Sequence, residues 1–343
     1  MMATIVMADD GVAFDGRSAA DGPLGGAETA FVALAEALAA RGHRVIARSR
    51  CDAAIEHNGV EWAPLAAGIP DACDLYIGNR GHRMIGLVRR TTRRLFWLHN
   101  PAGYLRKPRF LLRLAWHQPT LVATGAYHAA TVPRAAVLNG LEVIPYGILD
   151  PFRNAVLREP PPPCAVFTSS PLRGLDWLLD LWAARIHPAV PAAELHVFAG
   201  AGVYRGGAAK HAAQMAAVLA RAAAMHVHGV RCHDPIGRRA LALMLAGARV
   251  MLYRGDPGET FCLALAEAQA MGVPAVVQPF GSVVERVRDG ETGRIAVSDG
   301  EFAEAAITAL RDDQLWRRWH KAALATQRGL SWNEAAAKFE ALM

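Results

Sequence analysis

Disulfides, zinc ligands and membrane spans all lack support in this sequence. Its five cysteines are odd in number, widely spaced and free of any Cys-x-x-Cys pair, which indicates small buried side chains in a reducing compartment. The longest apolar run, 241–253, contains Arg249 and falls short of the ~18 to 20 residues that a membrane-spanning helix needs. No basic and apolar leader precedes the first strand-like segment. We therefore expect a cytoplasmic protein.

Metal-binding patterns are also missing from the sequence. It contains no Asp-x-Asp pair and no group of His, Asp and Glu residues at the spacing of metal ligands. Any catalysis is therefore expected to proceed without a metal ion or another bound cofactor.

Positive charge is concentrated in one stretch of the chain. The formal net charge is +6, and ten of the Lys and Arg residues lie within 80–113. Such a run is typical of a solvated face, and also of a region that docks on an anion such as a membrane surface or an acidic molecule. A nucleic-acid partner is not expected, because no aromatic-interleaved basic motif accompanies the run. Peripheral attachment to the inner face of a membrane therefore stays open.

The first half alternates short apolar strands with helical stretches, which is typical of a parallel sheet. Strands are expected at 4–9, 44–48, 74–78, 95–99, 120–124 and 142–146. The clearest helix spans 27–41, because Phe31, Leu34 and Leu38 form one apolar stripe and Gly42 follows. The first half is thus expected to form a doubly wound domain.

The second half repeats this rhythm after a run of four prolines at 160–163, where we place the domain boundary. Strands are expected at 164–169, 194–199, 225–229, 248–252 and 274–278, with helices at 174–186, 207–224, 236–246, 260–271 and 282–288. A last helix is expected after Ser331, with Glu334 at the capping-box position. Because ligands of open parallel sheets bind at the carboxyl ends of the strands, two such domains predict a cleft with the chemistry between them.

The sharpest motif is a Gly/Pro-rich loop at 255–258 that leads into a helix. Unpaired N–H groups and the positive end of a helix dipole make such a helix start an anion site suited to a diphosphate. Glu259 and Glu267 lie eight residues apart, or ~12 Å along a helix, which is similar to the reach from a sugar across a diphosphate to a ribose. Glu267 is flanked by apolar residues, which predicts a buried carboxylate that needs donors such as ribose hydroxyls; an exposed helix carboxylate is the alternative.

This Glu-x7-Glu motif, with the segments 268–274 and 279–285 that follow it, resembles the retaining glycosyltransferases of family 4, which have the GT-B fold. The resemblance covers most of the chain. It implies that Glu259 faces the donor sugar and that Glu267 holds the ribose. It also implies that the diphosphate meets the backbone of Thr260, Phe261, Cys262 and Leu263. The family usually has glycine where this sequence has Cys262.

Two segments of the first half also resemble parts of that family's site. Gly25 and Gly26 open a helix within Gly-Gly-Ala-Glu and are similar to the glycine loop that approaches the donor phosphate or the acceptor. His99 follows a strand and resembles the active-site histidine beside the donor sugar, with His82 as a weaker candidate for that role. The alternatives are an ordinary long loop for the glycines and a loop-capping role for His99.

The segment 169–176 resembles the stretch with which the family holds the diphosphate, where an Arg is followed five residues later by a Lys. Arg173 takes the Lys position, whereas Thr168 stands where the Arg is usual. Neutralisation of the leaving diphosphate is therefore expected from Arg173, the helix start and Arg254. A surface arginine is the alternative reading of Arg173.

A second glycine-rich turn, 200–206, superficially resembles a dinucleotide fingerprint. Its third glycine comes one place late, and no carboxylate ends the next expected strand, at 226–229, so NAD binding is not expected. We interpret Gly202 as part of a turn near the donor. By resemblance to the family, Val230 and Arg231 are expected near the nucleoside.

The resulting prediction is an α/β chain of GT-B fold that transfers a sugar from a nucleotide diphosphate sugar with retention of configuration. Retention, and UDP in preference to GDP, are implied by the resemblance. The predicted parts are an acceptor-side Rossmann-like domain at 1–155, a donor domain at 156–330, and a helix at 331–343 that returns to the first domain. The acceptor is unknown, with anionic or membrane-associated glycans and lipids as candidates. A GT-B nucleotide-sugar epimerase, a catalytically silent nucleotide-sugar binding subunit and a dehydrogenase are the alternatives.

Overall fold

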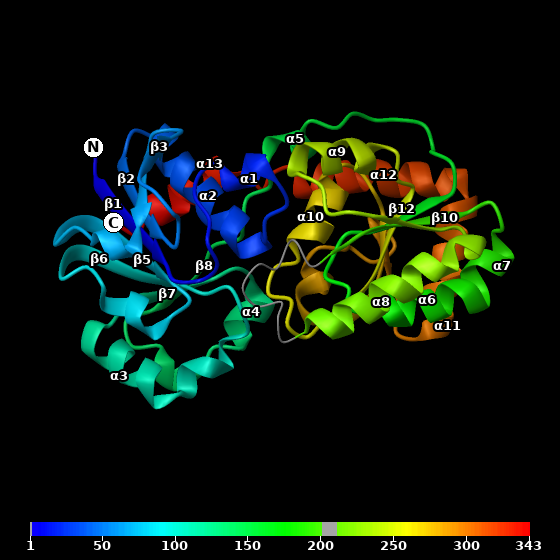
Figure 1. The fold of residues 1–343 in the computed structure, drawn as a ribbon. Helices are drawn as coiled ribbons and strands as arrows, with labels where there is room; N and C mark the ends of the chain where they lie inside the picture. The colour runs from blue at the N-terminus through cyan, green and yellow to red at the C-terminus, as the bar shows by residue number, and fades with distance from the viewer. Residues whose placement is uncertain (1, 201–210) are drawn as a thin grey trace. The chain divides into compact units, whose positions relative to one another are not determined.

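A computed structural model describes residues 2–200 and 211–343 and divides the chain into two compact units (Figure 1). The first unit comprises Met1–Gly147 and Leu330–Met343, and the second comprises Ile148–Gly329. Each unit contains one mainly parallel sheet with helices around it, as the alternating sequence pattern predicts. No helix in the described part of the chain is both long and apolar enough to span a membrane.

The first unit is built on an eight-stranded sheet with the order β3-β4-β2-β1-β5-β6-β7-β8. Only the β3–β4 pair is antiparallel. The strands are β1 (Thr4–Asp9), β2 (Arg44–Ser49), β3 (Ile55–His57), β4 (Val60–Pro64), β5 (Ala72–Asn79), β6 (Arg90–Trp97), β7 (Thr120–Ala123) and β8 (Leu141–Val143). The central strand β1 is apolar and fully buried from Ile5 to Ala8, as expected for a strand covered on both faces.

Helices of the first unit flank this sheet, and the last helix of the chain joins them. The α-helices are α1 (Ser18–Asp21), α2 (Gly26–Ala40), α3 (Pro108–His117), α4 (Ala126–Ala130) and α13 (Trp332–Glu340). The predicted stripe of α2 is confirmed, because Phe31, Leu34 and Leu38 are all fully buried.

The predicted return of the last helix to the first unit is confirmed. In Figure 1 α13, in red, lies beside α2, and Nε of Arg41 after α2 donates to the Glu340 carboxylate at 2.6 Å. Ser331 caps α13 and forms the expected capping box with Glu334. Gly147 lets α13 approach closely, because a Cβ there would lie 2.3 Å from the backbone nitrogen of Trp332.

The second unit has an all-parallel six-stranded sheet with the order β11-β10-β9-β12-β13-β14. Its strands are β9 (Cys164–Phe167), β10 (Glu194–Phe198), β11 (Val230–His233), β12 (Val250–Gly255), β13 (Ala275–Phe280) and β14 (Gly293–Ile295). Its α-helices are α5 (Asp150–Arg153), α6 (Leu175–Leu181), α7 (His187–Ala189), α8 (Ala212–Ala224), α9 (Arg238–Ala246), α10 (Leu263–Ala270), α11 (Asp299–Arg311) and α12 (Asp313–Gln327).

One predicted strand of the second unit is wrong. The segment Met225–His228 is a 3-10 turn, Gly229 has a φ of +72°, and the strand follows as β11. Glycine tolerates this left-handed conformation without steric cost, so the chain turns there before it enters the sheet. The strand therefore ends at His233, and a carboxylate, Asp234, follows it. The argument that no carboxylate ends this strand thus no longer speaks against NAD binding. The argument from the glycine spacing is unaffected.

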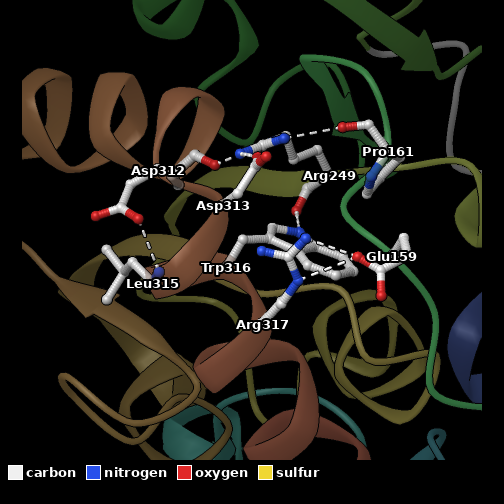
Figure 2. A network of polar contacts seen from close by, with 9 residues as sticks. Glu159, Pro161, Arg249, Asp312, Asp313, Leu315, Trp316 and Arg317 are labelled. Carbon is white, nitrogen blue, oxygen red and sulfur yellow. Dashed lines mark hydrogen bonds and ion pairs between the residues drawn. The ribbon is translucent and has the colours of Figure 1, made fainter.

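The four-proline segment packs on the second unit instead of separating the units. Figure 2 shows the buried Arg249, just before β12, donating to the Pro161 carbonyl at 3.0 Å and to the Asp313 carboxylate at 2.6 Å. Trp316 of α12 donates to the Arg249 carbonyl at 2.7 Å, and Arg317 pairs with Glu159. These contacts stiffen the entrance to β9, and the units divide upstream, after Gly147.

Candidate active site

The Glu-x7-Glu motif begins in a loop that joins the carboxyl end of β12 to α10. Within the loop, the Gly258 N–H donates to the Asp256 side chain at 2.7 Å and the Glu259 N–H donates to the Asp256 carbonyl at 2.9 Å. Gly281 has a φ of +68°, and a Cβ at this position would lie 2.2 Å from the Asp256 carbonyl oxygen. The loop is therefore held backbone against backbone, which fixes the position of Glu259.

Glu259 is a buried carboxylate with two partners inside the second unit. It pairs with Arg173, from the segment after β9, and its Oε1 accepts a hydrogen bond of 2.7 Å from the Tyr253 hydroxyl. Burial raises the pKa of Tyr253 well above its ordinary value, so this hydroxyl remains a donor at neutral pH. The structure thus brings together Glu259 and Arg173, which the sequence predicts in one site, and adds Tyr253, which it does not.

Glu267 lies on α10 and is fully buried. Its Oε2 accepts a hydrogen bond of 2.6 Å from Arg238, the first residue of α9. Its Oε1 has no hydrogen-bond partner among the described residues. Burial raises the pKa of Glu267 from 4.5 to about 7, and Arg238 limits this rise. The prediction of a buried carboxylate is confirmed, and one of its oxygens is available for a ligand donor.

The helix of this motif begins later than predicted. It starts at Leu263, so Glu259, Thr260 and Phe261 belong to the loop, and the rise of an ideal helix does not measure the separation of the two glutamates. Asp256 and Gly281 hold the loop in place of helical hydrogen bonds. The resemblance still implies that the loop backbone meets the diphosphate, but no regular helix spans the motif.

Cys262, the residue before α10, has a left-handed backbone with φ of +62°. Side chains with a Cβ disfavour this conformation, which glycine adopts freely. This geometry accounts for the glycine that the family usually has at this position. The Cys262 side chain is buried, so packing of its thiol offsets part of the backbone strain.

Arg254, the other cation predicted for the diphosphate, contacts neighbouring side chains of the fold. The Arg254 guanidinium lies 5.2 Å from the Trp177 ring centre and 5.1 Å from that of Phe280, and it donates to Gln278 at 3.1 Å. Thr168, in the usual Arg position, has a buried hydroxyl without a hydrogen-bond partner among the described residues. Of the two predicted arginines, Arg173 is the one that pairs with a glutamate of the motif.

Val230 and Arg231 are not brought together with these residues. They open β11 at its amino end, whereas Glu259 and Arg173 follow strands at their carboxyl ends. Arg231 pairs with Glu194 and also donates to the His226 carbonyl. Gly202 lies outside the described residues. Besides Tyr253, sequence reasoning missed Arg238, a cation at a helix start that follows a strand's carboxyl end.

In the first unit, His99 follows β6 and is buried against aromatic rings. Its Nδ1 lies 2.6 Å from the Tyr146 hydroxyl, and its ring centre lies 4.7 Å from that of Trp97. Burial, with Arg80 and His128 nearby, lowers the pKa of His99 well below 6.5, so the ring is neutral at pH 7. His82 lies elsewhere in this unit, with its ring 5.7 Å from Phe110.

A second histidine fixes the loop that carries His99. The Thr124 N–H donates to Nδ1 of the fully buried His128 at 3.1 Å, so the opposite nitrogen, Nε2, carries the proton and donates to the Asn100 carbonyl at 2.9 Å. Burial lowers the pKa of His128 to about 4, so the ring is neutral at pH 7 and its hydrogen bonds fix the tautomer. His128 thus positions the residue next to His99.

The two glycines at the start of α2 have different surroundings. A Cβ at Gly25 would lie 2.2 Å from Oε2 of Glu28, whereas a Cβ at Gly26 would meet nothing within 4 Å. Glu28 is buried and pairs with Arg80, which also donates to Asp9 at 3.0 Å. A larger residue at position 25 would therefore displace the Glu28 carboxylate, whereas the space next to Gly26 is open.

Comparison with known proteins gives this arrangement a family context. Residues 164–312 match the family model described as glycosyl transferases group 1. Over 112 residues the chain is 34% identical to the D-inositol 3-phosphate glycosyltransferase of Streptomyces coelicolor, a match that covers 32% of this chain and 24% of that relative. The comparison thus spans about a quarter of the length of the curated relative.

Solved structures match almost the whole chain. Sucrose-phosphate synthase from Thermosynechococcus elongatus is similar with a TM-score of 0.74 and 18% identity, over 99% of this chain and 98% of that one. Anabaena HepE in complex with UDP-glucose is similar with a TM-score of 0.73 and 16% identity, over 99% and 100%. WaaG, a glycosyltransferase involved in lipopolysaccharide biosynthesis, has a TM-score of 0.64 at 14% identity, over 99% of both chains. The chain therefore has the GT-B fold, and its residues 164–312 are similar to the group 1 glycosyl transferases.

Proposed function

We propose that this chain is a retaining glycosyltransferase that takes its sugar from a nucleotide diphosphate sugar bound by the second unit. The observation that carries the proposal is Glu267, a fully buried carboxylate with one oxygen on Arg238 and the other without a partner among the described residues. A buried carboxylate oxygen needs a donor, and the two hydroxyls of a ribose supply donors with the right polarity. In this proposal Glu267 holds the ribose of the donor.

The same proposal gives Glu259 and Arg173 the reacting end of the donor. Cleavage of the anomeric C–O bond leaves its electron pair on the departing phosphate, and the cation of Arg173 stabilises that charge. Glu259 pairs with Arg173, and the Tyr253 hydroxyl donates to Glu259 and orients it. The acceptor oxygen then bonds to the anomeric carbon on the same face, and its proton passes to the departing phosphate oxygen.

His99 would act as a neutral hydrogen-bonding group beside the sugar. Its low pKa excludes an imidazolium at pH 7, and Tyr146 fixes the orientation of the ring. The open space at Gly26 suits the approach of a phosphate or an acceptor to the start of α2. Metal independence rests on the absence of an Asp-x-Asp pair from the sequence, and the preference for UDP is supported by HepE, which has been solved with UDP and UDP-glucose.

A catalytically silent nucleotide-sugar binding subunit is the second candidate, and Thr168 favours it. A threonine in place of the usual Arg removes one positive charge from the diphosphate site, and Arg173 is itself neutralised by Glu259. Both features reduce stabilisation of the leaving group.

A ligand screen followed by product analysis tests these proposals. A nucleotide diphosphate at 100 times its dissociation constant should add about 2.7 kcal/mol to the free energy of unfolding. We expect UDP sugars to raise the melting temperature more than GDP sugars, and slow donor hydrolysis to release a sugar of unchanged anomeric configuration. Tight binding without any turnover would favour the silent subunit, an epimerised sugar would favour the epimerase, and no stabilisation by any nucleotide would refute donor binding.

A further inference from the structure

The first unit contains a long stretch without acidic residues. From Leu75 to Leu141 the sequence has eleven Arg and Lys residues and no Asp or Glu. The stretch includes the helix α3, which Figure 1 shows in turquoise at the edge of the first unit. Arg106 and Lys107, directly before this helix, are both exposed. The charged residues of α3 and of the chain around it are therefore all positive.

The helix α3 has an inward face that belongs to the core. Phe110 and Leu114, one turn apart, are buried and pack in a cluster with Phe96, Leu98 and Leu105. This face explains why the helix forms, because its burial of apolar surface offsets the loss of chain entropy. The core therefore does not need the apolar residues on the opposite face.

That opposite face carries two large apolar side chains that alternate with two arginines along the helix. Arg109, Leu112, Arg113 and Trp116 follow the i, i+3, i+4, i+7 spacing of one helical face. Leu112 is 72% exposed and Trp116 is 83% exposed. These four residues form the outward face of α3, in which an apolar pair lies beside a cationic pair and no acidic residue is present.

This combination matches the surface of an anionic bilayer. A helix with apolar residues on one side and basic residues beside them lies in the plane of a membrane interface, where Trp is favoured. Each basic residue near an anionic surface adds roughly fivefold to binding. Arginines without carboxylates nearby are free of competing ion pairs, and none of the salt bridges among the described residues involves Arg109 or Arg113.

We propose that the outward face of α3, formed by Arg109, Leu112, Arg113 and Trp116, binds the surface of an anionic lipid bilayer. Leu112 and Trp116 enter the interface while the two arginines contact lipid phosphates. The binding is peripheral and reversible, and it weakens with salt because it depends on exposed charge. The proposal does not depend on the proposed transferase activity, and it can be tested without a sugar substrate.

Vesicle sedimentation with the full chain tests this proposal. We expect the protein to sediment with vesicles that contain phosphatidylglycerol, to remain in solution with phosphatidylcholine alone, and to be released by high salt. The double variant Leu112→Ser with Trp116→Ser should lower binding by at least about tenfold, because two buried apolar contacts are lost. The double variant Arg109→Gln with Arg113→Gln should lower it by about 25-fold, from two factors of roughly five.

The matched control is Leu243→Ser, on α9 of the second unit, because Leu243 is 77% exposed and lies outside the acid-free stretch. It should bind vesicles like the parent, and all variants should keep the parent's unfolding midpoint because the changed side chains are exposed. Equal vesicle binding by the parent and the Leu112/Trp116 variant would overturn the proposal. So would a parent that ignores phosphatidylglycerol, or one that binds a single-stranded oligonucleotide but no vesicle.

Discussion

Replacing Glu267 with Gln tests the donor site most directly. The change keeps the shape of the side chain but removes its charge, and it turns one oxygen into an amide that can only donate. Arg238 can still donate to the remaining oxygen, so the contact between α9 and α10 survives in weaker form. A ribose hydroxyl that donates to the unpartnered oxygen of Glu267 would lose its acceptor.

The expected loss of affinity follows from the strength of hydrogen bonds to a charged group. Such bonds contribute about 1.5 to 3 kcal/mol, or roughly 10- to 150-fold in the dissociation constant. Glu267→Gln should therefore weaken binding of a free nucleoside diphosphate by this factor. Glu259→Gln is the matched control, because its proposed partner in the donor is the sugar, which the free nucleotide lacks, and because the Gln oxygen can still accept a hydrogen bond from Arg173. This variant should bind the nucleotide nearly as the parent does, yet turn over donor sugar more slowly.

The pH dependence provides a second, independent measure. The pKa of Glu267 is raised from 4.5 to about 7, so the folded protein holds this proton more tightly than the unfolded chain does. Stability from this group is therefore lost as the pH rises from about 4 to 8, mainly between the two pKa values, by about 3 kcal/mol in total. Between pH 6 and pH 8 the ionised fraction of Glu267 increases about tenfold, and nucleotide affinity should increase with it.

Calorimetry and denaturant unfolding at both ends of this range give the result. In the Gln variant the stability loss with pH should be smaller by about 3 kcal/mol, and the increase of affinity should be smaller by about tenfold. Because the nucleotide also titrates, the comparison is between the parent and the variant at each pH. Identical pH profiles, or equal affinity losses in the Glu267 and Glu259 variants, would show that the donor is misplaced on this loop and helix.

Three further predictions concern backbone positions at Cys262, at the start of α2 and at Gly147. At Cys262 the left-handed backbone should make Cys262→Gly more stable than Cys262→Ala by about 1 kcal/mol in urea unfolding, and the reverse order would refute strain there. Gly25→Ala should destabilise the protein in the parent but not in a Glu28→Ala background, whereas Gly26→Ala should leave stability unchanged; an equal cost of Gly25→Ala in both backgrounds would exclude the clash with Glu28. Gly147→Ala should cost about 1 to 3 kcal/mol by pushing on the Trp332 backbone, and an unchanged melting temperature would mean that α13 does not dock as described.

The sequence predicts the sheets well because their strands are short, apolar and separated by clear turns. β1 and β9 both lie within the expected segments, β12 extends three residues past its expected end at 252, and the capping box of α13 is visible as Ser331 and Glu334. It misplaces β11 because His226 to Gly229 reads as a strand, although the positive φ of Gly229 ends a turn there. The helix α3 is not predicted, because its mixed outward face of arginines and Leu112 hides the apolar stripe.

The sequence predicts the motif residues of the candidate site but not all of their ion-pair partners. A motif identifies Glu259, Glu267 and Arg173, because their spacing is local or resembles a family pattern. The motif does not identify Arg238 or Arg80. The order of the strands brings each of these arginines next to its carboxylate, which is distant in the sequence. Pairing across a sheet edge depends on strand order, which a single sequence does not specify.

The distribution of buried charge supports a functional edge in each unit. Among the described residues, four ion pairs have a carboxylate side chain less than a tenth exposed: Asp9 and Glu28 with Arg80, Glu259 with Arg173, and Glu267 with Arg238. Asp9 is the last residue of β1, and the other members of these pairs lie in the segments that follow the carboxyl ends of parallel strands. By contrast, the pair of the buried Arg249 has an exposed carboxylate, and carbonyl oxygens satisfy the rest of that arginine. Burying an ionised carboxylate costs desolvation free energy that its ion pair only partly returns, so the fold gains little from the four pairs. Their position at the edges where such sheets bind ligands is instead the arrangement expected if each unit holds part of a charged, hydroxyl-rich substrate.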